Sequence, residues 1–404
     1  MGLKLGVLGV GSFAQCFIPL FKAHPLVDEL VFCDHNAEKL KANAEKYGVR
    51  RCFDSLEQLC ASDVDAVAVI TQHWLHAPQA LQLLNARKHV YSAVPSAVSM
   101  NEMEQLVDTV GRRRLIYMVG ETSYYYPEAI YCRERFQKGD FGHAVYGEAE
   151  YYHDWEHGLY DVMKWRHGAD WRSKAGDPPM FYPTHSVGML VSVTGAHASH
   201  VSCHGFVDRK PEDRDIYNPE NPWGNRFSNE SALLKMSDGS TFRINEFRRV
   251  GHPGTVRMTL FGTEASFECN STGSAWLTRD HAATIRLDEL LRCGDLAAEN
   301  GSENMNKVTA ADGTHKDVSR VHPIARLPRE FRGLTNGHSG SHQFLVDDFV
   351  RACASNMLPP NNVWQAARYL LPGLVAHESA RRGGELLPVP DLGSAPAGWD
   401  CLKF

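Results

Sequence analysis

The stretch LKLGVLGVGSFA, residues 3–14, decides the fold of the first part of this chain. Its leucine- and valine-rich start predicts a buried parallel strand, and the turn Gly9-Val10-Gly11-Ser12-Phe13-Ala14 then opens a helix. In that context a G-x-G-x-x-A motif indicates a dinucleotide-binding turn. Gly9 permits the tight turn, Gly11 lets the backbone approach a pyrophosphate, and Ala14 keeps helix and strand close together. We therefore predict that Gly9, Gly11, Ser12, Phe13 and Ala14 form a phosphate site at a helix N-terminus.

The partner group of that turn is an acid at the end of the second predicted strand, residues 29–34, where Asp34 stands. An acidic side chain at this position binds a ribose hydroxyl and repels a 2′-phosphate, so we expect NAD rather than NADP. His35 weakens that preference a little. A glycine turn that merely packs would not need the strand, the helix and the acid together.

Strand and helix patterns alternate over about the first 120 residues. Ser55 with Gln58 and Ser99 with Glu102 have the spacing of helix capping boxes. Six strands interleaved with helices indicate an α/β Rossmann fold with a doubly wound parallel sheet, and we place an NAD-binding domain at residues 1–122. The predicted strands are residues 3–10, 29–34, 51–53, 64–71, 89–94 and 115–121.

The pattern changes after residue 122. A helix over about 127–138 is followed by alternating segments, and residues 230–247 and 255–269 have the pattern of β-hairpins. Residues 298–340 are polar and weakly periodic, which predicts an extended loop, and two helices within 342–382 close the chain. We therefore expect a C-terminal α+β substrate and oligomerisation domain over residues 123–404, C-terminal helices included.

Composition excludes several classes of protein. With 42 Lys and Arg against 48 Asp and Glu, the net charge of −6 gives no general attraction to nucleic acid or to an anionic membrane. We find no apolar run near the ~18 residues needed to span a bilayer, and the first residues do not resemble a signal peptide. The 10 cysteines form no C-x-x-C pair, so we expect reduced thiols, no zinc site and a cytoplasmic protein.

With these motifs on the page, the chain resembles the Gfo/Idh/MocA family of sugar-active, nicotinamide-dependent proteins. The resemblance also includes ITQHWLHAPQAL (70–81), RKHVYSAVPSAVS (87–99), ADWRSKAG (169–176) and SGSHQFLVDDFV (339–350). It implies a second domain with a large open antiparallel sheet, and a homo-oligomer, a dimer or tetramer, formed through that sheet. It further implies cofactor contacts from Thr71, His76 and Ala93.

Two departures from the family pattern concern the chemistry. Family dehydrogenases carry Glu-Lys-Pro after the fifth strand, whereas this chain has Ala93-Val94-Pro95, and Val94 cannot move a proton. The Asp and His of those dehydrogenases are replaced by Pro183 and Val187. The usual catalytic set is therefore absent.

A different pair of residues stands in its place. The chain reads Tyr182-Pro183-Thr184-His185, and a Y-x-x-H here, together with Val94, resembles the NAD-dependent glycosidases of glycoside hydrolase family 109. That resemblance implies that Tyr182 and His185 lie in a sugar site. It also implies that NAD stays bound while a ring carbon is oxidised and then reduced again.

Elementary chemistry supports Tyr182 and His185 as catalytic groups. Pro183 suits the first turn of a helix, and residues three apart can project from the same side of a helix start. A helix N-terminus disfavours positive charge, which favours a neutral His185 that can accept a proton. Tyr182 needs a nearby cation, such as Arg172 or oxidised nicotinamide, to act as a base. The structural alternative is a capped helix with a satisfied histidine and a packed tyrosine.

Further residues are candidate sugar contacts. Tyr124 and Tyr126 stand where the first domain ends, and Glu121 ends its sixth strand; hinge packing is the alternative for the tyrosines. His153 lies in the polar-aromatic stretch 151–157, and Arg172 matches a family position. His153 and His157 would suit a metal only on a helix, and the local pattern is strand then loop, so we predict no metal site. His338 and His342 either face the site or are loop and cap residues.

These observations predict an NAD-dependent carbohydrate-active enzyme that transfers a hydride at a sugar ring carbon, acting on a sugar or glycoside. We expect this step to belong to redox-assisted glycoside cleavage: oxidation, elimination, addition of water and reduction. The alternative is a simple NAD-dependent sugar or cyclitol dehydrogenase with Tyr182 or His185 as its base. A third reading is a non-catalytic NAD-binding sensor, against which the Tyr-His pair argues.

Overall fold

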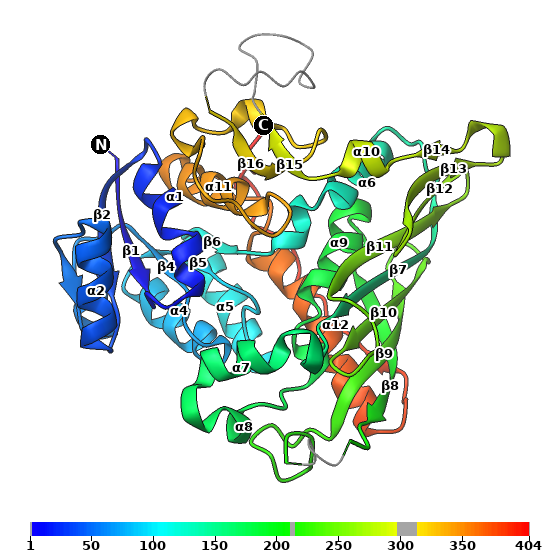
Figure 1. The fold of residues 1–404 in the computed structure, drawn as a ribbon, viewed down its shortest axis with the longest axis horizontal. Helices are drawn as coiled ribbons and strands as arrows, with labels where there is room; N and C mark the ends of the chain where they lie inside the picture. The colour runs from blue at the N-terminus through cyan, green and yellow to red at the C-terminus, as the bar shows by residue number, and fades with distance from the viewer. Residues whose placement is uncertain (1, 211–214, 297–312, 404) are drawn as a thin grey trace. The chain divides into compact units, whose positions relative to one another are not determined.

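The computed structural model describes residues 2–210, 215–296 and 313–403 of the chain. Contacts divide the chain into two compact units, and each is assembled from separate stretches (Figure 1). The first unit comprises Met1–Pro127, Leu290–Ala367 and Leu392–Phe404, and the second comprises Glu128–Glu289 and Arg368–Asp391. We predict two domains that follow one another in the sequence, 1–122 and 123–404, and that division stays a prediction.

The first unit is built on a six-stranded parallel sheet in the order β3-β2-β1-β4-β5-β6, which is the order of doubly wound dinucleotide-binding sheets. The predicted Rossmann fold is therefore confirmed. From Leu5 onward β1 is buried, which explains why a continuous apolar run forms this strand. The strands are β1 (Leu3–Leu8), β2 (Val27–Cys33), β3 (Cys52–Phe53), β4 (Ala66–Val69), β5 (His89–Ser92) and β6 (Tyr117–Val119).

The helix after the glycine turn differs from its prediction. A short 3₁₀ helix, Phe13–Cys16, precedes α1 (Ile18–Ala23), because Pro19 has no N–H to continue an α-helix through this point. Ser55 and Ser99 do cap their helices: their hydroxyls accept the backbone N–H of Gln58 and Glu102, each at 3.3 Å. The other helices that begin and end in this unit are α2 (Ala37–Tyr47), α3 (Leu56–Ala61), α4 (His76–Asn85), α5 (Met100–Arg113) and α11 (Ser341–Ser355).

Part of the predicted extended loop is ordered structure of the first unit. β16 (His315–Val318) pairs antiparallel with β15 (Gly294–Leu296), and two 3₁₀ turns follow at Ile324–Arg326 and Arg329–Phe331. Residues 298–312 of that prediction lie outside the described residues. The chain then enters α11, which packs against α1 and β1 beside the glycine turn (Figure 1).

The second unit contains a nine-stranded sheet in the order β14-β13-β12-β11-β7-β10-β9-β8-β17. Both predicted hairpins form, β9 with β10 and β11 with β12. The sheet is mixed rather than wholly antiparallel, because β7 is inserted between the two hairpins and runs parallel to β10. Its strands are β7 (Ala144–Tyr152), β8 (Ala198–Val207), β9 (Phe227–Met236), β10 (Thr241–Phe247), β11 (Thr255–Gly262), β12 (Ala265–Asn270), β13 (Gly273–Thr278), β14 (Ile285–Arg286) and β17 (Leu387–Pro388).

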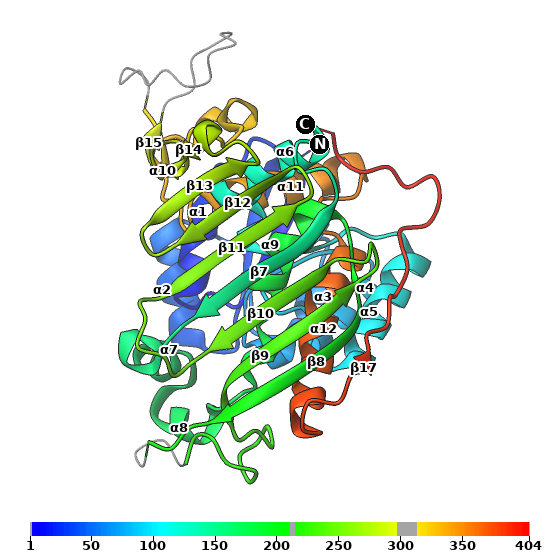
Figure 2. The same cartoon turned by 90° about the vertical axis from the view of Figure 1, so that its right-hand side faces the viewer.

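One face of this sheet is covered. The almost wholly buried helix α9 (Thr184–Thr194) packs on β7, β10 and β11, and Figure 2 looks onto the opposite, uncovered face. The remaining helices are α6 (Pro127–Gln137), α7 (Leu159–His167), α8 (Trp171–Lys174), α10 (Asp288–Leu291) and α12 (Val363–Arg381). In the described part of the chain, no helix combines the length and apolar character needed to cross a membrane.

Candidate functional site

The glycine turn of the first unit has the shape that a dinucleotide requires. Gly9 has φ +87°, and a Cβ there would lie 2.6 Å from the carbonyl oxygen of Ile70, so only glycine fits. A Cβ on Gly11, by contrast, would meet nothing within 4 Å, which leaves open space beside the backbone. The turn therefore combines a tight approach to the sheet with room for a phosphate.

Asp34 completes this part of the site. Its carboxylate accepts the backbone N–H of Val10 at 3.0 Å through Oδ2 and that of Asn36 at 2.9 Å through Oδ1. A carboxylate has further lone pairs, so Asp34 can hold the turn and still accept a ribose hydroxyl. The residues present thus fit NAD.

The other predicted cofactor residues lie at the carboxyl ends of β4 and β5. The His76 ring nitrogens lie 2.8 Å from the carbonyl oxygen of Pro95 and 3.1 Å from that of Thr71, so this ring joins the two strand ends. The Thr71 hydroxyl donates to Gln79 at 2.6 Å, and the backbone of Ala93 bonds to Val69 at 3.0 Å. Direct cofactor contacts from these three residues stay a prediction.

His338 and His342 also lie beside the glycine turn. Their rings are joined by a 2.9 Å contact between Nδ1 of His338 and Nε2 of His342. Both rings stand edge-on to Phe13 of the turn, with centroids 6.0 and 6.2 Å away. Burial, and then the neighbouring His338, lowers the pKa of His342 to about 3, so its imidazole is neutral.

The tyrosine run and Glu121 are tightly packed within the first unit. Glu121 is fully buried and accepts the N–H of Ser123 at 2.8 Å, which caps the 3₁₀ helix Thr122–Tyr125. The Tyr125 hydroxyl contacts Asp348 and Arg326 of the same unit, and Tyr124 stacks edge-on against Tyr125 at 4.9 Å. Tyr126 is buried as well. Sugar contacts from Tyr124, Tyr126 and Glu121 therefore stay a prediction.

In the second unit, Tyr182 does not lie on the helix start as expected. Tyr182 follows a 3₁₀ turn, Pro179–Phe181, and α9 begins only at Thr184, with Pro183 as its N-cap residue. The prediction that Tyr182 lies on the helix start is therefore wrong, because Tyr182 precedes the first helical residue by two positions. His185 does lie in the first turn of α9, and it is buried.

The cation beside Tyr182 is Arg166 of α7 and not Arg172. Arg166 donates from Nη1 to the Tyr182 hydroxyl at 3.3 Å. Arg172 instead forms two bonds with Asp215, each of 2.6 Å. Burial raises the pKa of Tyr182, and the Arg166 guanidinium works against that rise. Arg166, with a smaller contribution from Arg248, is thus placed to favour a phenolate at Tyr182.

A second phenol and a second imidazole join this cluster. The Tyr151 hydroxyl lies 3.0 Å from Nδ1 of His153, and the Tyr151 ring stands edge-on to His185 with centroids 5.1 Å apart. The guanidinium of Arg248 lies 4.7 Å above the Tyr151 ring. Burial, and then Arg248 and Arg166, lower the pKa of His153 to about 4, so this ring is neutral near pH 7. Sequence reasoning missed Arg248, and it singled out His153 and Arg172 rather than their neighbours Tyr151 and Arg166.

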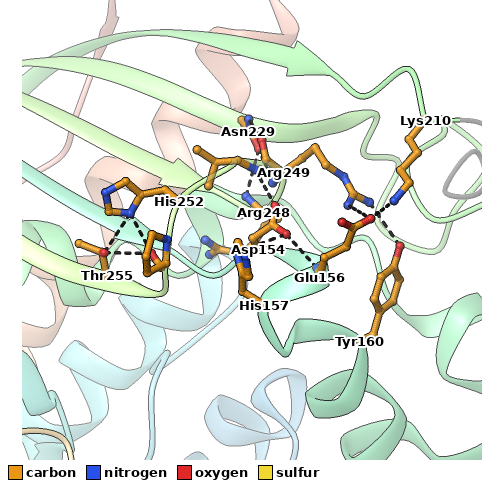
Figure 3. A network of polar contacts seen from close by, with 12 residues as sticks. Asp154, Glu156, His157, Tyr160, Lys210, Asn229, Arg248, Arg249, His252 and Thr255 are labelled. Carbon is orange, nitrogen blue, oxygen red and sulfur yellow. Dashed lines mark hydrogen bonds and ion pairs between the residues drawn. The ribbon is translucent and has the colours of Figure 1, made fainter. Parts of the chain in front are cut away.

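A network of polar contacts holds the loop that follows β7, directly after His153 in the chain (Figure 3). Asp154 accepts the N–H of Glu156 at 2.8 Å and that of Val250 at 2.6 Å, while Arg249 lies 3.8 Å from Glu156. His157 belongs to a 3₁₀ turn and not to a strand or a longer helix. Within residues 2–210, 215–296 and 313–403 no group of three or more His, Cys, Asp or Glu side chains is arranged for a metal ion.

Comparison with known proteins now adds the family. Residues 3–121 match the model GFO_IDH_MocA, described as an oxidoreductase family with an NAD-binding Rossmann fold. These residues belong to the Gfo/Idh/MocA oxidoreductase family. The predicted family resemblance and the NAD cofactor are thereby confirmed, as is the prediction of an NAD-dependent enzyme of the oxidoreductase superfamily.

Similarity to known proteins extends beyond the residues that match this family model. A glycosyl hydrolase family 109 protein of Streptomyces filamentosus is 25% identical, over 96% of this chain and 77% of its own. One of Saccharopolyspora erythraea is 28% identical, over 96% of this chain and 83% of its own. The solved structure of a levoglucosan dehydrogenase in complex with NADH and L-sorbose is similar in fold, with a TM-score of 0.71 at 17% identity over 97% of this chain and all of its own.

Proposed function

We propose that this protein is an NAD-dependent carbohydrate-active enzyme that transfers a hydride at a sugar ring carbon during redox-neutral glycoside cleavage. The observation that carries the proposal is a cluster of side chains: Tyr182 is bonded to Arg166, and His185 stands edge-on to Tyr151. Val94, which occupies the position of the family's catalytic lysine, is apolar. That cluster supplies two separate proton-transfer groups, and a dehydrogenase needs only one. The relatives of glycosyl hydrolase family 109, aligned over 96% of this chain, support the same conclusion.

The chain's own residues would divide the proton transfers. Bound NAD supplies a reversible acceptor for the hydride of a ring carbon. Arg166 favours the phenolate of Tyr182, which can then take a proton from a sugar hydroxyl or from a ring carbon. His185, held edge-on by Tyr151, can exchange the second proton. Which group takes which proton stays open.

The overall reaction balances without a net oxidant. Loss of a hydride and a hydroxyl proton at C3 gives a ketone, and the ketone makes the C2 proton acidic. Removal of that proton breaks the C1–O bond, and the aglycone leaves with a proton. Water then adds at C1 and a proton returns to C2. Finally the hydride returns to C3 and a proton returns to its oxygen, which restores the hydroxyl. One glycoside and one water give one sugar and one alcohol.

Turnover of an aryl glycoside in D₂O tests this proposal. We expect deuterium at C2 of the released sugar and no net accumulation of NADH. Tyr182→Phe and His185→Ala should each lower turnover by roughly 10²–10⁴-fold, the usual cost of losing a positioned acid or base, with NAD affinity unchanged. If NADH forms stoichiometrically without exchange at C2, the protein is a simple sugar dehydrogenase. If NAD binds but no sugar or glycoside is turned over, the sensor reading is favoured.

We also propose that the protein forms a homo-oligomer through the uncovered face of the nine-stranded sheet. Leu233 of β9 is 52% exposed there, in register with Arg243 of β10. Burying Leu233 against a second copy of the chain would remove its apolar surface from water, which favours association. Light scattering of the protein and of a Leu233→Glu variant checks the proposal, which requires an oligomer that the variant weakens.

A further inference from the structure

A row of three polar side chains crosses the covered face of the nine-stranded sheet. Tyr151 of β7 is in register with Glu246 of β10, and Glu246 is in register with Glu230 of β9. On one side of this row, the neighbours along the strands on the same face are apolar: Ala149, Ile244 and Ala232. Both glutamates are 0% exposed. Burying two carboxylates under a helix is costly unless each has partners.

Glu230 holds the start of the segment that carries Tyr182 and His185. Its Oε2 accepts the backbone N–H of Met180 at 2.9 Å, and its Oε1 lies 2.7 Å from Nδ1 of His377. The Met180 amide belongs to the 3₁₀ turn directly before Tyr182. A carboxylate can accept from both partners, whereas a glutamine would turn an NH₂ group toward one of these donors.

Glu246 holds the other end of the same segment. Its Oε1 lies 2.5 Å from the hydroxyl of Ser186, and its Oε2 accepts from Arg248 at 3.2 Å. Arg248 also donates to the carbonyl oxygen of Pro179 at 3.3 Å, and thus reaches the start of the segment as well. Residues 179–186 are therefore tied to the sheet on both sides of Tyr182 and His185.

The proton count at Ser186 supports a defined arrangement. The Ser186 hydroxyl lies 2.5 Å from Glu246 and 3.0 Å from the carbonyl oxygen of Pro183, but it has one proton to donate. Both contacts become hydrogen bonds when Glu246 is protonated and donates to Ser186, which then donates to Pro183. Burial raises the pKa of Glu246 to about 8, against the opposing effect of Arg248, which agrees with this arrangement.

Helix α12 closes the segment from another side. A Cβ on Gly373 would lie 2.2 Å from the carbonyl oxygen of Met180 and 2.3 Å from Cγ of Pro183. Glycine is therefore required for the close approach of α12 to the segment. The 179–186 segment has little freedom to shift between the sheet and this helix.

We propose that Glu230 and Glu246 are positioning residues, which hold Tyr182 and His185 in the geometry needed for proton transfer. The inference rests on the proposed function, since it assigns these two side chains their roles. It goes beyond that function because neither glutamate touches the sugar: each acts through the backbone or through Ser186. Displacing catalytic groups by about 1 Å can cost on the order of 10²-fold in rate.

The test compares Glu230→Gln, Glu246→Leu and Ser186→Ala with the full-length wild type, using an aryl glycoside as substrate. We expect kcat to fall by roughly 10–100-fold with a much smaller change in KM and with unchanged NAD affinity. Glu246→Leu and Ser186→Ala should not be additive, because they interrupt one contact. Glu246→Gln should keep most of the activity, because its amide can donate to Ser186 and accept from Arg248 as the protonated carboxyl does. Glu150→Gln is the matched control: Glu150 is a buried carboxylate of the same sheet that bonds Arg257 at 2.6 Å, outside the polar row.

A second measurement does not depend on turnover. Amide hydrogen exchange over residues 179–190 should accelerate in Glu230→Gln and Glu246→Leu and stay unchanged in Glu150→Gln. Gly373→Ala, which displaces the segment without altering a carboxylate, should reproduce the loss of kcat if the glutamate variants fold poorly. Unchanged kcat and unchanged exchange in both Glu230→Gln and Glu246→Leu would overturn the positioning role and leave the proposed function standing. A wild type that turns over no sugar or glycoside would overturn the proposed function and this catalytic role together, while exchange would still show whether the carboxylates hold the segment.

Discussion

Replacing Arg166 by methionine probes the origin of Tyr182 reactivity. The Arg166 guanidinium lies 3.3 Å from the Tyr182 hydroxyl, and burial raises the pKa of that phenol. If Tyr182 acts as a base, the rate rises with pH as the phenol ionises. Loss of the cation removes an opposing influence, so the pKa must rise further and the rising limb of the pH–rate profile must move to higher pH.

The size of this shift follows from the distance. Two unit charges 3.3 Å apart interact by about 1.3 kcal/mol in a water-like medium and by about 5 kcal/mol at an effective dielectric constant of 20. Because Arg166 is exposed, the lower value applies, and it corresponds to about one pKa unit. We therefore expect a shift of about one pH unit and a roughly tenfold lower rate at neutral pH.

The assay is the pH dependence of kcat/KM for wild type, Arg166→Met, Arg166→Lys and Arg172→Met on one aryl glycoside. Arg166→Lys keeps the charge and should restore most of the profile. Arg172→Met is the matched control, since that guanidinium bonds Asp215 and not Tyr182. An active Arg166→Met enzyme with an unshifted profile, or an equal shift in Arg172→Met, would refute the assignment of Arg166 as the cation for Tyr182.

Two further predictions concern the cofactor turn. Asp34→Ala should reduce the preference for NAD over NADP, since the carboxylate that repels a 2′-phosphate is lost. Calorimetric titration with both dinucleotides measures this preference, and tighter NADP binding by the wild type would contradict the prediction. Gly9→Ala should lower NAD affinity and the melting temperature, since φ is +87° and the new Cβ would lie 2.6 Å from the Ile70 carbonyl oxygen; Gly251→Ala, where a Cβ meets nothing within 4 Å, should leave both nearly unchanged.

The cofactor turn could be read from the sequence because its determinants are local. Strand, glycines and helix follow one another within 3–14, and Asp34 ends the adjacent strand β2. The pairing of Tyr182 with Arg166 could not be read in this way. It depends on how α7 lies against a 3₁₀ turn 16 residues later, and family position pointed to Arg172 instead. The interruption between the 3₁₀ turn Pro179–Phe181 and α9 likewise follows from Pro183. The sequence placed this proline in the first turn of the helix, whereas it is the N-cap residue of α9.

The two buried glutamates had a signal in the sequence that was not used. In β9, Glu230 lies an even number of residues from Ala232 and Leu234, and in β10, Glu246 lies two residues from Ile244. Period-2 alternation therefore already assigns both carboxylates to the apolar face. Their common target, the 179–186 segment, could not be predicted, because it depends on strand register and on the insertion of β7 beside β10.

The stability of the first unit should fall in mild acid because of His322. This buried ring accepts the Ser319 N–H at Nδ1 (2.9 Å) and donates from Nε2 to the carbonyl oxygen of Tyr125 (2.8 Å), so a second proton would displace the Ser319 bond. Burial lowers its pKa to about 4, against about 6.5 in an unfolded chain. Below pH ~6.5 the unfolded state therefore binds a proton at this histidine that the folded state does not bind. The free energy of unfolding falls as the pH is lowered from ~6.5 to ~4, and this residue contributes up to about 3 kcal/mol of the loss. Urea unfolding across this range should show a smaller loss in His322→Gln, which can still donate to Tyr125 but cannot titrate, whereas His35→Gln, at a 90% exposed side chain, should behave as wild type. An unchanged pH dependence in His322→Gln would show that other groups, such as His153 or His342, cause the acid sensitivity.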